Sequence, residues 1–344
     1  ATPVGPEWLD GASLRFVGSA TIGTDHVDQA FLQAREIPFA HAPGSNADSV
    51  ADYVVAALLL LGRRRGVSLE GRTVGIIGCG NIGGRLARRL PALGLTVLKN
   101  DPPRARAAEA DGRPHDFRPL TPVLQASDIV TLHVPLTTDG PAPTHHLVDA
   151  AFLDRLRDEA WLLNTSRGRV VSGDALLAAR RRGAVAAMGL DVWEHEPSPA
   201  PPLVQAADVA TPHIAGYAYD GKVRGTDMLY RALCEQLGVE PTWAGTATIR
   251  PAAKDALQCT PPDPRLPTTE WRHHLARQAY NLQADDTALR SIPARPREAR
   301  AKAFQQLRRT YRRRRELQQH TVPPAAVPDA HRQAVETGLT IQRR

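Results

Sequence analysis

The chain is poor in cysteine. Its 344 residues contain only Cys79, Cys234 and Cys259, and their spacing is typical neither of a disulfide framework nor of a zinc site. Disulfides accumulate in oxidising compartments, whereas cytoplasmic thiols are kept reduced. We therefore predict a cytoplasmic protein without a disulfide framework and without a bound metal.

The sequence also lacks a long hydrophobic run. The longest one, residues 54–61, is well short of the roughly 20 residues that span a bilayer. No positively charged segment followed by an apolar stretch stands at the start, so nothing there is typical of an export signal. We expect no membrane partner, and we predict that residues 54–61 belong to one buried helix.

Acidic residues are outnumbered, with 36 Asp and Glu against 43 Lys and Arg. The excess gathers in the last third of the chain, above all at Arg308, Arg309 and residues 312–315. A basic run of this kind can bind nucleic acid, but the only aromatic side chain within it is Tyr311. We interpret the run as a solvated helix face and predict no nucleic-acid partner.

Short apolar runs alternate with helical patterns over most of the chain. The predicted strands are residues 72–77, 95–98, 129–134, 160–164, 186–191 and 209–211. The predicted helices are residues 48–61, 85–93, 120–126, 150–156, 172–182 and 222–236. The alternation predicts an α/β fold with a doubly wound parallel sheet. A proline cluster at 251–267 is predicted to be a linker, followed by helices at 271–283 and 297–318.

A glycine-rich turn joins the first of these strands to its helix. The turn consists of Gly78, Cys79, Gly80, Asn81, Ile82 and Gly83. Asp101 stands 18 residues after the last glycine, at the end of the next strand, and in this context the pattern indicates a dinucleotide site. Gly78 permits the turn, Gly80 lets a pyrophosphate approach the backbone, and Gly83 permits close helix packing. Because a carboxylate binds ribose hydroxyls and repels a 2′-phosphate, we predict NAD as the cofactor.

Three polar side chains follow later strands. Arg167 comes just after residues 160–164, Glu196 follows residues 186–191, and His213 follows residues 209–211. Ligands of such sheets bind at the carboxyl ends of the strands. A guanidinium there can hold a carboxylate by two parallel hydrogen bonds, or it can pair with a nearby acid.

A carboxylate beside an imidazole fixes the tautomer of the imidazole and favours its charged form. The set is therefore suited to the oxidation of a 2-hydroxy acid. His213 would take the hydroxyl proton while a hydride leaves the same carbon. His195, next to Glu196, is the weaker candidate for this base.

With these residues, the chain resembles the D-isomer-specific 2-hydroxyacid dehydrogenase family. The resemblance rests on residues 18–28, 101–104, 191–197, 213–217 and 221–226, and it covers nearly the whole chain, more weakly after Gly245. It implies oxidation of 4-phospho-D-erythronate by NAD to 3-hydroxy-2-oxo-4-phosphooxybutanoate, in the biosynthesis of pyridoxal 5′-phosphate. By position it makes Arg167, Glu196 and His213 the catalytic residues.

The resemblance also implies which residues contact NAD and the substrate, and how the chain is divided into domains. Besides the turn residues Gly78, Gly80, Asn81, Ile82 and Gly83, the NAD contacts that it implies are Asp101, Val134, Asp191 and Gly216, and the substrate contacts are Thr21 and Tyr217. Residues 1–42 with 214–245 would form part of a flavodoxin-like substrate lobe, and residues 43–213 the NAD-binding domain. Residues 246–344 would form an α+β domain that mediates homodimerisation.

The sequence departs from the family in one respect. Members of the family begin with about one more strand–helix–strand unit, which contains a serine expected at the substrate phosphate. Lys222 and Arg224 are further candidates for that phosphate. Two other functions stay open: a D-2-hydroxyacid dehydrogenase acting on 3-phosphoglycerate or hydroxypyruvate, and a non-catalytic NAD-binding regulator.

Overall fold

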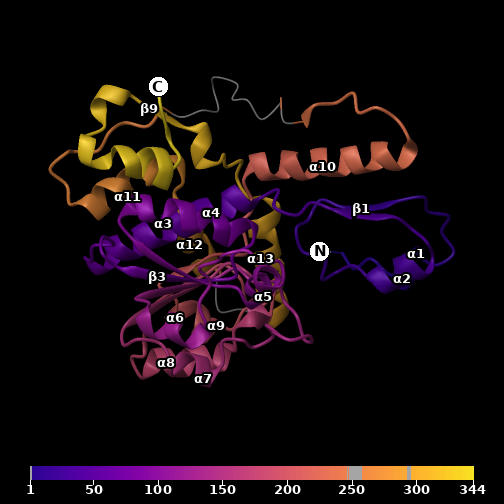
Figure 1. The fold of residues 1–344 in the computed structure, drawn as a ribbon, viewed down its shortest axis with the longest axis horizontal. Helices are drawn as coiled ribbons and strands as arrows, with labels where there is room; N and C mark the ends of the chain where they lie inside the picture. Colours follow the sequence, from indigo (N-terminus) through magenta and orange to yellow (C-terminus); the bar gives the residue numbers. More distant parts are fainter. Residues whose placement is uncertain (1, 246, 248–257, 293–295) are drawn as a thin grey trace.

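A parallel six-stranded sheet lies at the centre of the computed structural model, which describes residues 2–245, 247, 258–292 and 296–344 (Figure 1). The strand order is β4-β3-β5-β6-β7-β8. The strands are β3 (Thr73–Ile77), β4 (Thr96–Asn100), β5 (Ile129–Leu132), β6 (Ala160–Asn164), β7 (Val185–Leu190) and β8 (Val209–Ala210). An isolated parallel bridge between Lys99 and Phe117 continues the sheet beyond β4. The predicted doubly wound parallel sheet is confirmed, and its order reverses at β3.

Helices cover both faces of this sheet. On one face lie α3 (Ala47–Arg65) and α4 (Asn81–Arg89). The other sheet helices are α5 (Pro102–Ala110), α6 (Leu120–Ala126), α7 (Ala150–Leu153), α8 (Gly173–Arg181) and α9 (Pro201–Ala206). The core accordingly forms two buried clusters, one containing α3 and one containing the inner faces of α6, α7 and α8.

The predicted buried helix at residues 48–61 is confirmed by α3. Its residues are buried almost without interruption up to Gly62, because the sheet covers one side and the C-terminal helices cover the other. It ends at Gly66, whose φ of 62° is the left-handed conformation that glycine adopts readily. Within the part of the chain that the structure describes, no helix is long and apolar enough to cross a membrane.

A smaller lobe stands beside the sheet domain, at the right of Figure 1. It consists of α1 (Pro6–Leu9), β1 (Val17–Ser19), α2 (Gln29–Ala34), β2 (Phe39–His41) and α10 (Tyr219–Leu237). The two strands pair in parallel, and α10 packs against both of them. The helix predicted at residues 222–236 is confirmed by α10. The lobe is thus built from two segments that lie far apart in the sequence.

Much of the C-terminal segment packs on the outer side of α3 and α4. Its elements are α11 (Thr268–Ala279), α12 (Leu282–Arg290), α13 (Arg297–Arg309), β9 (Thr321–Val322) and β10 (Gln342–Arg343). Trp271, Leu275 and Ile341 are buried in the same cluster as α3. The predicted linker at 251–267 lies partly outside the described residues. The C-terminal segment therefore completes the core on this face, while Leu289 of α12 and Phe304 of α13 are buried in the cluster that contains α6, α7 and α8.

Two predictions for this segment were wrong. The helix predicted at 271–283 is interrupted after Ala279, because Asn281 begins α12 by accepting a hydrogen bond from the N–H of Ala284. The helix predicted at 297–318 ends at Arg309, and the chain continues in an irregular conformation.

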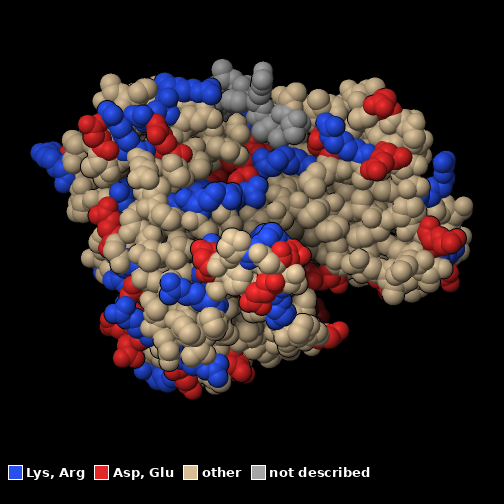
Figure 2. Space-filling view, in the orientation of Figure 1, with Lys and Arg blue, Asp and Glu red and all other residues tan. Residues whose placement is uncertain are grey.

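The arginine run is a solvated helix face only in part, since Arg309 is exposed on α13 while residues 312–315 lie beyond the helix. Arg312 pairs with the buried carboxylate of Asp285, and Arg315 donates hydrogen bonds of 2.8 and 3.0 Å to Asp220. Arg314 is buried, with its guanidinium 4.0 Å from the centre of the Tyr280 ring. The interpretation was wrong for Arg314 and Arg315, because internal groups rather than water surround them, whereas Arg312 and Arg313 are exposed. On the face seen in Figure 2, Lys and Arg are interspersed with Asp and Glu.

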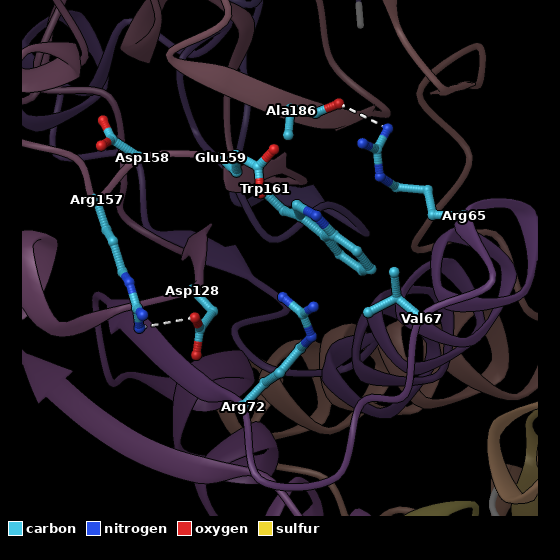
Figure 3. Close-up of a pocket in the computed structure, with 9 residues that line it drawn as sticks. All are labelled: Arg65, Val67, Arg72, Asp128, Arg157, Asp158, Glu159, Trp161 and Ala186. Atoms are coloured by element: carbon cyan, nitrogen blue, oxygen red, sulfur yellow. Dashed lines mark hydrogen bonds and ion pairs between the residues drawn. The ribbon is translucent and has the colours of Figure 1, made fainter.

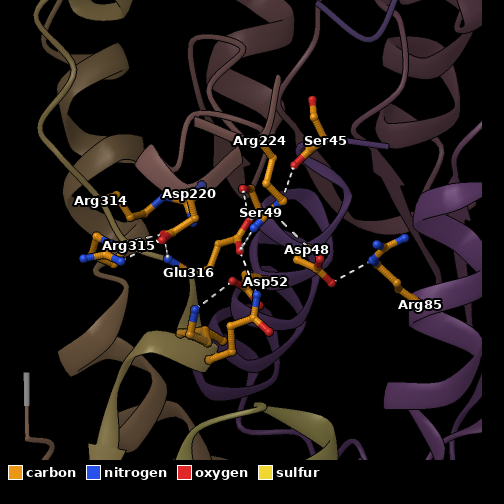
Figure 4. Close-up of polar contacts among 12 residues, drawn as sticks. Ser45, Asp48, Ser49, Asp52, Arg85, Asp220, Arg224, Arg314, Arg315 and Glu316 are labelled. Atoms are coloured by element: carbon orange, nitrogen blue, oxygen red, sulfur yellow. Dashed lines mark hydrogen bonds and ion pairs between the residues drawn. The ribbon is translucent and has the colours of Figure 1, made fainter. Parts of the chain in front are cut away.

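Glu316 of the C-terminal segment forms hydrogen bonds with both α3 and α10 (Figure 4). Its carboxylate is fully buried, accepts a hydrogen bond of 2.7 Å from Ser49 on α3 and one of 2.9 Å from Arg224 on α10. Its own N–H donates to Asp220 at 2.8 Å. Next to it, burial raises the pKa of Asp52 to about 6, although the Arg89 guanidinium lies 2.8 Å from its carboxylate. The junction of core, lobe and C-terminal segment therefore consists of buried ion pairs.

We expect Glu316→Ala to destabilise the protein by about 3–5 kcal/mol, because the partly buried Arg224 loses its nearest carboxylate and the buried Ser49 hydroxyl loses its acceptor. Urea unfolding followed by circular dichroism measures the change. The control is Glu298→Ala, which removes an exposed carboxylate from the first turn of α13 and should cost about 1 kcal/mol or less. An equal loss of unfolding free energy in the two variants would show that the buried junction stabilises the protein no more than an exposed carboxylate does.

Candidate active site

The glycine turn leaves an open cradle at the carboxyl end of β3. Gly78 has a φ of 87°, and a Cβ there would lie 2.6 Å from the carbonyl oxygen of His133. A Cβ on Gly83 would lie 2.1 Å from the carbonyl oxygen of Gly78. A Cβ on Gly80, by contrast, would meet no protein atom within 4 Å. The fold therefore requires glycine at positions 78 and 83. The space above Gly80, at the amino end of α4, fits a phosphate group.

Asp101 is fixed beside this turn. It follows β4 and begins α5, and its carboxylate accepts the N–H of Cys79 at 2.8 Å and the N–H of Arg104 at 3.1 Å. Each oxygen thus keeps one lone pair that a ribose hydroxyl could use. Val134 lies against Gly78, since a Cβ on that glycine would be 2.9 Å from the Val134 Cγ1. These residues and the turn surround one end of the cradle.

The two remaining residues of the turn differ in exposure. Asn81 is exposed at the start of α4, with its side-chain amide against Gly44, and Ile82 is half-buried against the core. Both belong to the first turn of the helix, whose amide groups point toward the cradle.

His213 and Glu196 form a hydrogen-bonded pair. The Nδ1 atom of His213 lies 2.7 Å from Oε2 of Glu196. Burial raises the pKa of Glu196, but the hydrogen bond and charge of His213, the Trp193 N–H and the Arg308 charge together bring this pKa below its usual value. An ionised carboxylate only accepts, so Nδ1 carries a proton, and in the neutral ring Nε2 keeps its lone pair. This tautomer makes Nε2 a proton acceptor.

The competing histidine is not part of this pair. His195 is exposed, and Glu196 bonds His213 instead.

The buried carboxylate of Asp191 holds the loop that presents His213. It accepts hydrogen bonds from the Thr211 hydroxyl at 2.6 Å and from the N–H groups of Ile214 and Ala215 at 2.8 and 2.9 Å. The carbonyl oxygen of Asp191 also accepts the N–H of His213 at 2.7 Å. Three bonds leave this carboxylate one free lone pair for the NAD contact that the resemblance implies.

The backbone of His213 is strained. Its φ of 57° lies in the left-handed region, which residues other than glycine seldom adopt. Such strain persists only where surrounding contacts enforce it, and it is common at functional sites.

Arg167 reaches from the end of β6 to the smaller lobe. Its Nε donates to Asp25 at 2.8 Å, and its Nη1 donates to the carbonyl of Ser166 at 2.9 Å. Its Nη2 faces Gly23, where a Cβ would lie 1.6 Å from it. Thr21 supports the same loop by donating to the carbonyl of Gly23 at 2.8 Å. The arginine is paired with an acid, one of the two possibilities left open by the sequence, and it lies at the junction of the two lobes.

Tyr217 follows His213 on the same loop, with Gly216 packed against the side chain of Asn46. The Nζ atom of Lys222 is 4.8 Å from the centre of the Tyr217 ring, and the Cζ atom of Arg308 is 5.4 Å from it. Arg308 was not predicted as a site residue, because the sequence contains no signal that brings α13 to this loop.

Arg224 is a corrected prediction. It donates to Glu316 and to the carbonyl of Ser45, so its guanidinium belongs to the buried junction rather than to a phosphate site.

The structure thus divides the predicted residues between two groups. The first group lies around the glycine turn and consists of Asn81, Ile82, Asp101 and Val134. The second group lies around the loop after β8 and consists of Glu196, His213 and Tyr217. Both groups stand at the carboxyl edge of the same sheet. Arg167 and Thr21 lie where this edge meets the smaller lobe.

A separate hollow of about 250 Å³ lies at the opposite edge of the sheet (Figure 3). Its walls include the Arg157–Asp128 ion pair of 2.9 Å, and Arg65, which donates to the carbonyl of Ala186. Arg72 lies over the ring of Trp161. These charged groups already have partners within the wall, so we assign the hollow no ligand. Within the described ranges, no group of three or more His, Cys, Asp or Glu could hold a metal ion.

Comparison with known proteins gives two family matches. Residues 59–215 match the D-isomer specific 2-hydroxyacid dehydrogenase, NAD binding domain, and residues 266–336 match a domain of unknown function, DUF3410. An erythronate-4-phosphate dehydrogenase of Salinibacter ruber is 71% identical over 341 residues, which cover 99% of this chain and 87% of that protein. One of Marinobacter nauticus is 43% identical and covers 92% of this chain and 81% of that protein.

Solved structures show the same fold. D-lactate dehydrogenase of Aquifex aeolicus, complexed with NAD and lactic acid, has a TM-score of 0.57 and 27% identity, and the match covers 68% of this chain and 80% of that chain. NAD-dependent formate dehydrogenase of Staphylococcus aureus, in complex with NAD, has a TM-score of 0.55 and 28% identity, covering 67% and 74% of the two chains.

We expect Gly80→Ala to weaken NAD binding at least tenfold without lowering the melting temperature, because its Cβ would meet only the bound diphosphate. Titration of NAD by protein fluorescence or calorimetry measures the effect. Gly84→Ala is the matched control, since its Cβ would make only an ordinary contact of 3.6 Å with Cys79. Unchanged NAD affinity in Gly80→Ala would place the diphosphate elsewhere.

Proposed function

The chain belongs to the D-isomer-specific 2-hydroxyacid dehydrogenase family, and within it to the erythronate-4-phosphate dehydrogenases, and we therefore propose that it oxidises 4-phospho-D-erythronate with NAD. The product is 3-hydroxy-2-oxo-4-phosphooxybutanoate, and the reaction belongs to the biosynthesis of pyridoxal 5′-phosphate. The observation that carries the proposal in the structure is the 2.7 Å bond between His213 and Glu196, which leaves a proton acceptor at the sheet edge.

In the proposed reaction, the Nε2 atom of His213 takes the proton of the C2 hydroxyl group. NAD, when bound, accepts the hydride that leaves the same carbon. The Glu196 carboxylate stabilises the imidazolium that results, and holds the ring in the orientation that presents Nε2. In the reverse direction the imidazolium returns the proton to the oxygen of C2.

Arg167 is the group that we assign to the substrate carboxylate. Its guanidinium can form two parallel hydrogen bonds with a carboxylate, and its present partner, Asp25, is itself a carboxylate. We assign Thr21, which bonds the Gly23 carbonyl in the same loop, to the substrate as well. The residues assigned to NAD are those of the glycine turn with Asp101, Val134, Asp191 and Gly216.

We further propose the organisation and setting of the enzyme. Residues 1–42 with 214–245 act as the substrate lobe, residues 43–213 bind NAD, and residues 246–344 mediate a homodimer. The separate family match over residues 266–336 supports a distinct role for this last segment. The three cysteines are unpaired and buried, which is consistent with a cytoplasmic location.

The substrate is tested by the rate of NADH formation with 4-phospho-D-erythronate and with 3-phosphoglycerate, and by NADH consumption with hydroxypyruvate. We expect kcat/KM for 4-phospho-D-erythronate to exceed that for 3-phosphoglycerate by at least about 100-fold, since a site built for one polar substrate rejects analogues that leave its groups unpaired. A preference for 3-phosphoglycerate or hydroxypyruvate would replace the proposed substrate by another 2-hydroxy acid.

For the base, we expect His213→Asn to lower kcat by about 10²–10⁴-fold, because general base catalysis is lost, while the affinity for NAD stays unchanged. Stopped-flow or steady-state absorbance of NADH measures kcat, and a separate titration measures NAD affinity. The control is His195→Asn, which changes an exposed histidine next to Glu196 in the same way. Wild-type turnover in the His213 variant would reject its role as base.

A further inference from the structure

Helix α13 of the C-terminal segment runs beside the catalytic loops. Near its start, the Ser198 hydroxyl forms weak hydrogen bonds of 3.4 Å to the carbonyl of Arg297 and 3.5 Å to Arg300. Ser198 is two residues after Glu196. At the other end of α13, Arg308 lies over the ring of Tyr217, four residues after His213. One helix of the C-terminal segment therefore contacts the chain on both sides of the His213–Glu196 pair.

Two cations from different elements converge on Tyr217. Lys222 comes from the first turn of α10 and Arg308 from the last turn of α13, with their charged ends 4.8 and 5.4 Å from the ring centre. Among the side chains that the structure describes, the Tyr217 hydroxyl has no hydrogen-bond partner, and no carboxylate lies within ion-pair distance of either cation.

The neighbouring arginines differ from Arg308 in this respect. Arg224, Arg312 and Arg315 each pair with a buried carboxylate. The Nε of Arg308 is buried without an acceptor in the described part of the chain. The Arg308 charge lowers the pKa of Glu196, but no ion pair joins the two side chains. A partly buried cation without such a pair is costly, and a bound anion would offset that cost.

We propose that Arg308 and Lys222, on either side of Tyr217, bind the phosphate group of the substrate, so that the C-terminal segment supplies a specificity-determining residue to the active site. This inference rests on the proposed function. A phosphate monoester carries close to two negative charges, and a guanidinium, an ammonium and a phenol hydroxyl all donate hydrogen bonds to its oxygens.

The spacing of the loop is compatible with the length of the substrate. Tyr217 and His213 are joined by a tight turn, in which the Tyr217 N–H donates to the carbonyl of Ile214 at 2.9 Å. In 4-phospho-D-erythronate, the reacting C2 and the phosphate-bearing C4 are only two bonds apart. In a substrate whose C2 faces His213, the phosphate is therefore only a short distance from C2. The same loop contains Tyr217, and Lys222 and Arg308 lie beside its ring. The diphosphate of NAD has a separate place at the glycine turn.

The test is a kinetic comparison of Arg308→Ala with the wild type, using 4-phospho-D-erythronate and D-erythronate. We expect KM for the phosphorylated acid to rise about 10–100-fold, since a hydrogen bond to a charged group is lost. The KM for NAD and the kcat/KM for D-erythronate, which has no phosphate, should stay within twofold of the wild type. Inorganic phosphate, used as a competitive inhibitor, should lose affinity by a factor similar to the rise in KM.

Arg309→Ala is the matched control, because it removes an exposed arginine from the same helical turn without a contact to Tyr217. It should leave every one of these constants unchanged. Lys222→Gln provides a second test on a different element, and as a substitution of an exposed side chain it is compatible with folding even if Arg308→Ala is not. It should raise the same KM and the same inhibition constant.

The outcomes separate this inference from the proposed function. Wild-type enzyme that oxidises 4-phospho-D-erythronate, together with unchanged KM and phosphate inhibition in Arg308→Ala and Lys222→Gln, would overturn the phosphate site alone. Equal losses with D-erythronate and the phosphorylated acid would also overturn it, because the residues would then act on the reacting end. Wild-type enzyme that does not oxidise the phosphorylated acid at all would instead refute the proposed function.

Discussion

The geometry of the site depends on the buried carboxylate of Asp191. It accepts hydrogen bonds from one hydroxyl and two backbone N–H groups of the loop after β8, while its own carbonyl binds the N–H of His213. These bonds offset the unfavourable left-handed backbone at His213, whose φ is 57°. Burial raises the pKa of Asp191, whereas the His213 charge and these hydrogen bonds lower it. The carboxylate thus orients the imidazole without contacting it.

The same loop is supported from its other side by the C-terminal segment. Arg314 donates to the carbonyl of Ala215 at 2.8 Å, and its own carbonyl accepts the N–H of Tyr219 at 2.8 Å. Two residues further along, Glu316 binds α3 and α10. The loop of His213 is therefore held between Asp191 in the sheet domain and Arg314 in the C-terminal segment. This explains why Arg314 and Arg315 are internal, because their charges lie where the three parts of the chain meet.

Local sequence patterns were sufficient to predict the strands and the glycine turn of the sheet domain. Alternating apolar runs gave the strands, and the glycine turn was recognisable because the spacing of its glycines follows from steric contacts with their nearest neighbours, such as that of Gly83 with the Gly78 carbonyl. The bond between His213 and Glu196 could be anticipated for a similar reason, because both residues follow strands that end at the same edge.

The C-terminal segment was less predictable, because its structure depends on distant partners. Whether Arg312, Arg314 and Arg315 face water or buried groups is decided by Asp285, Tyr280 and Asp220, which belong to other elements. Helical periodicity carries no information on such pairs. The position of Arg308 beside Tyr217 could not be found for the same reason, and Arg224 was misassigned because its partner, Glu316, is 92 residues away.

The two connections of the smaller lobe differ in strength. At the start of α10, Asp220 and Arg224 are held by the buried pairs with Arg315 and Glu316. At the sheet edge, the lobe is joined through Arg167 and Asp25, a pair that is partly exposed and so contributes little free energy. A substrate carboxylate bound to Arg167 can therefore replace Asp25 at low cost, whereas the α10 junction stays intact. Under the proposed function, the contact at Arg167 is thus the one that the substrate exchanges, whereas Tyr217 and Lys222 lie next to the buried junction.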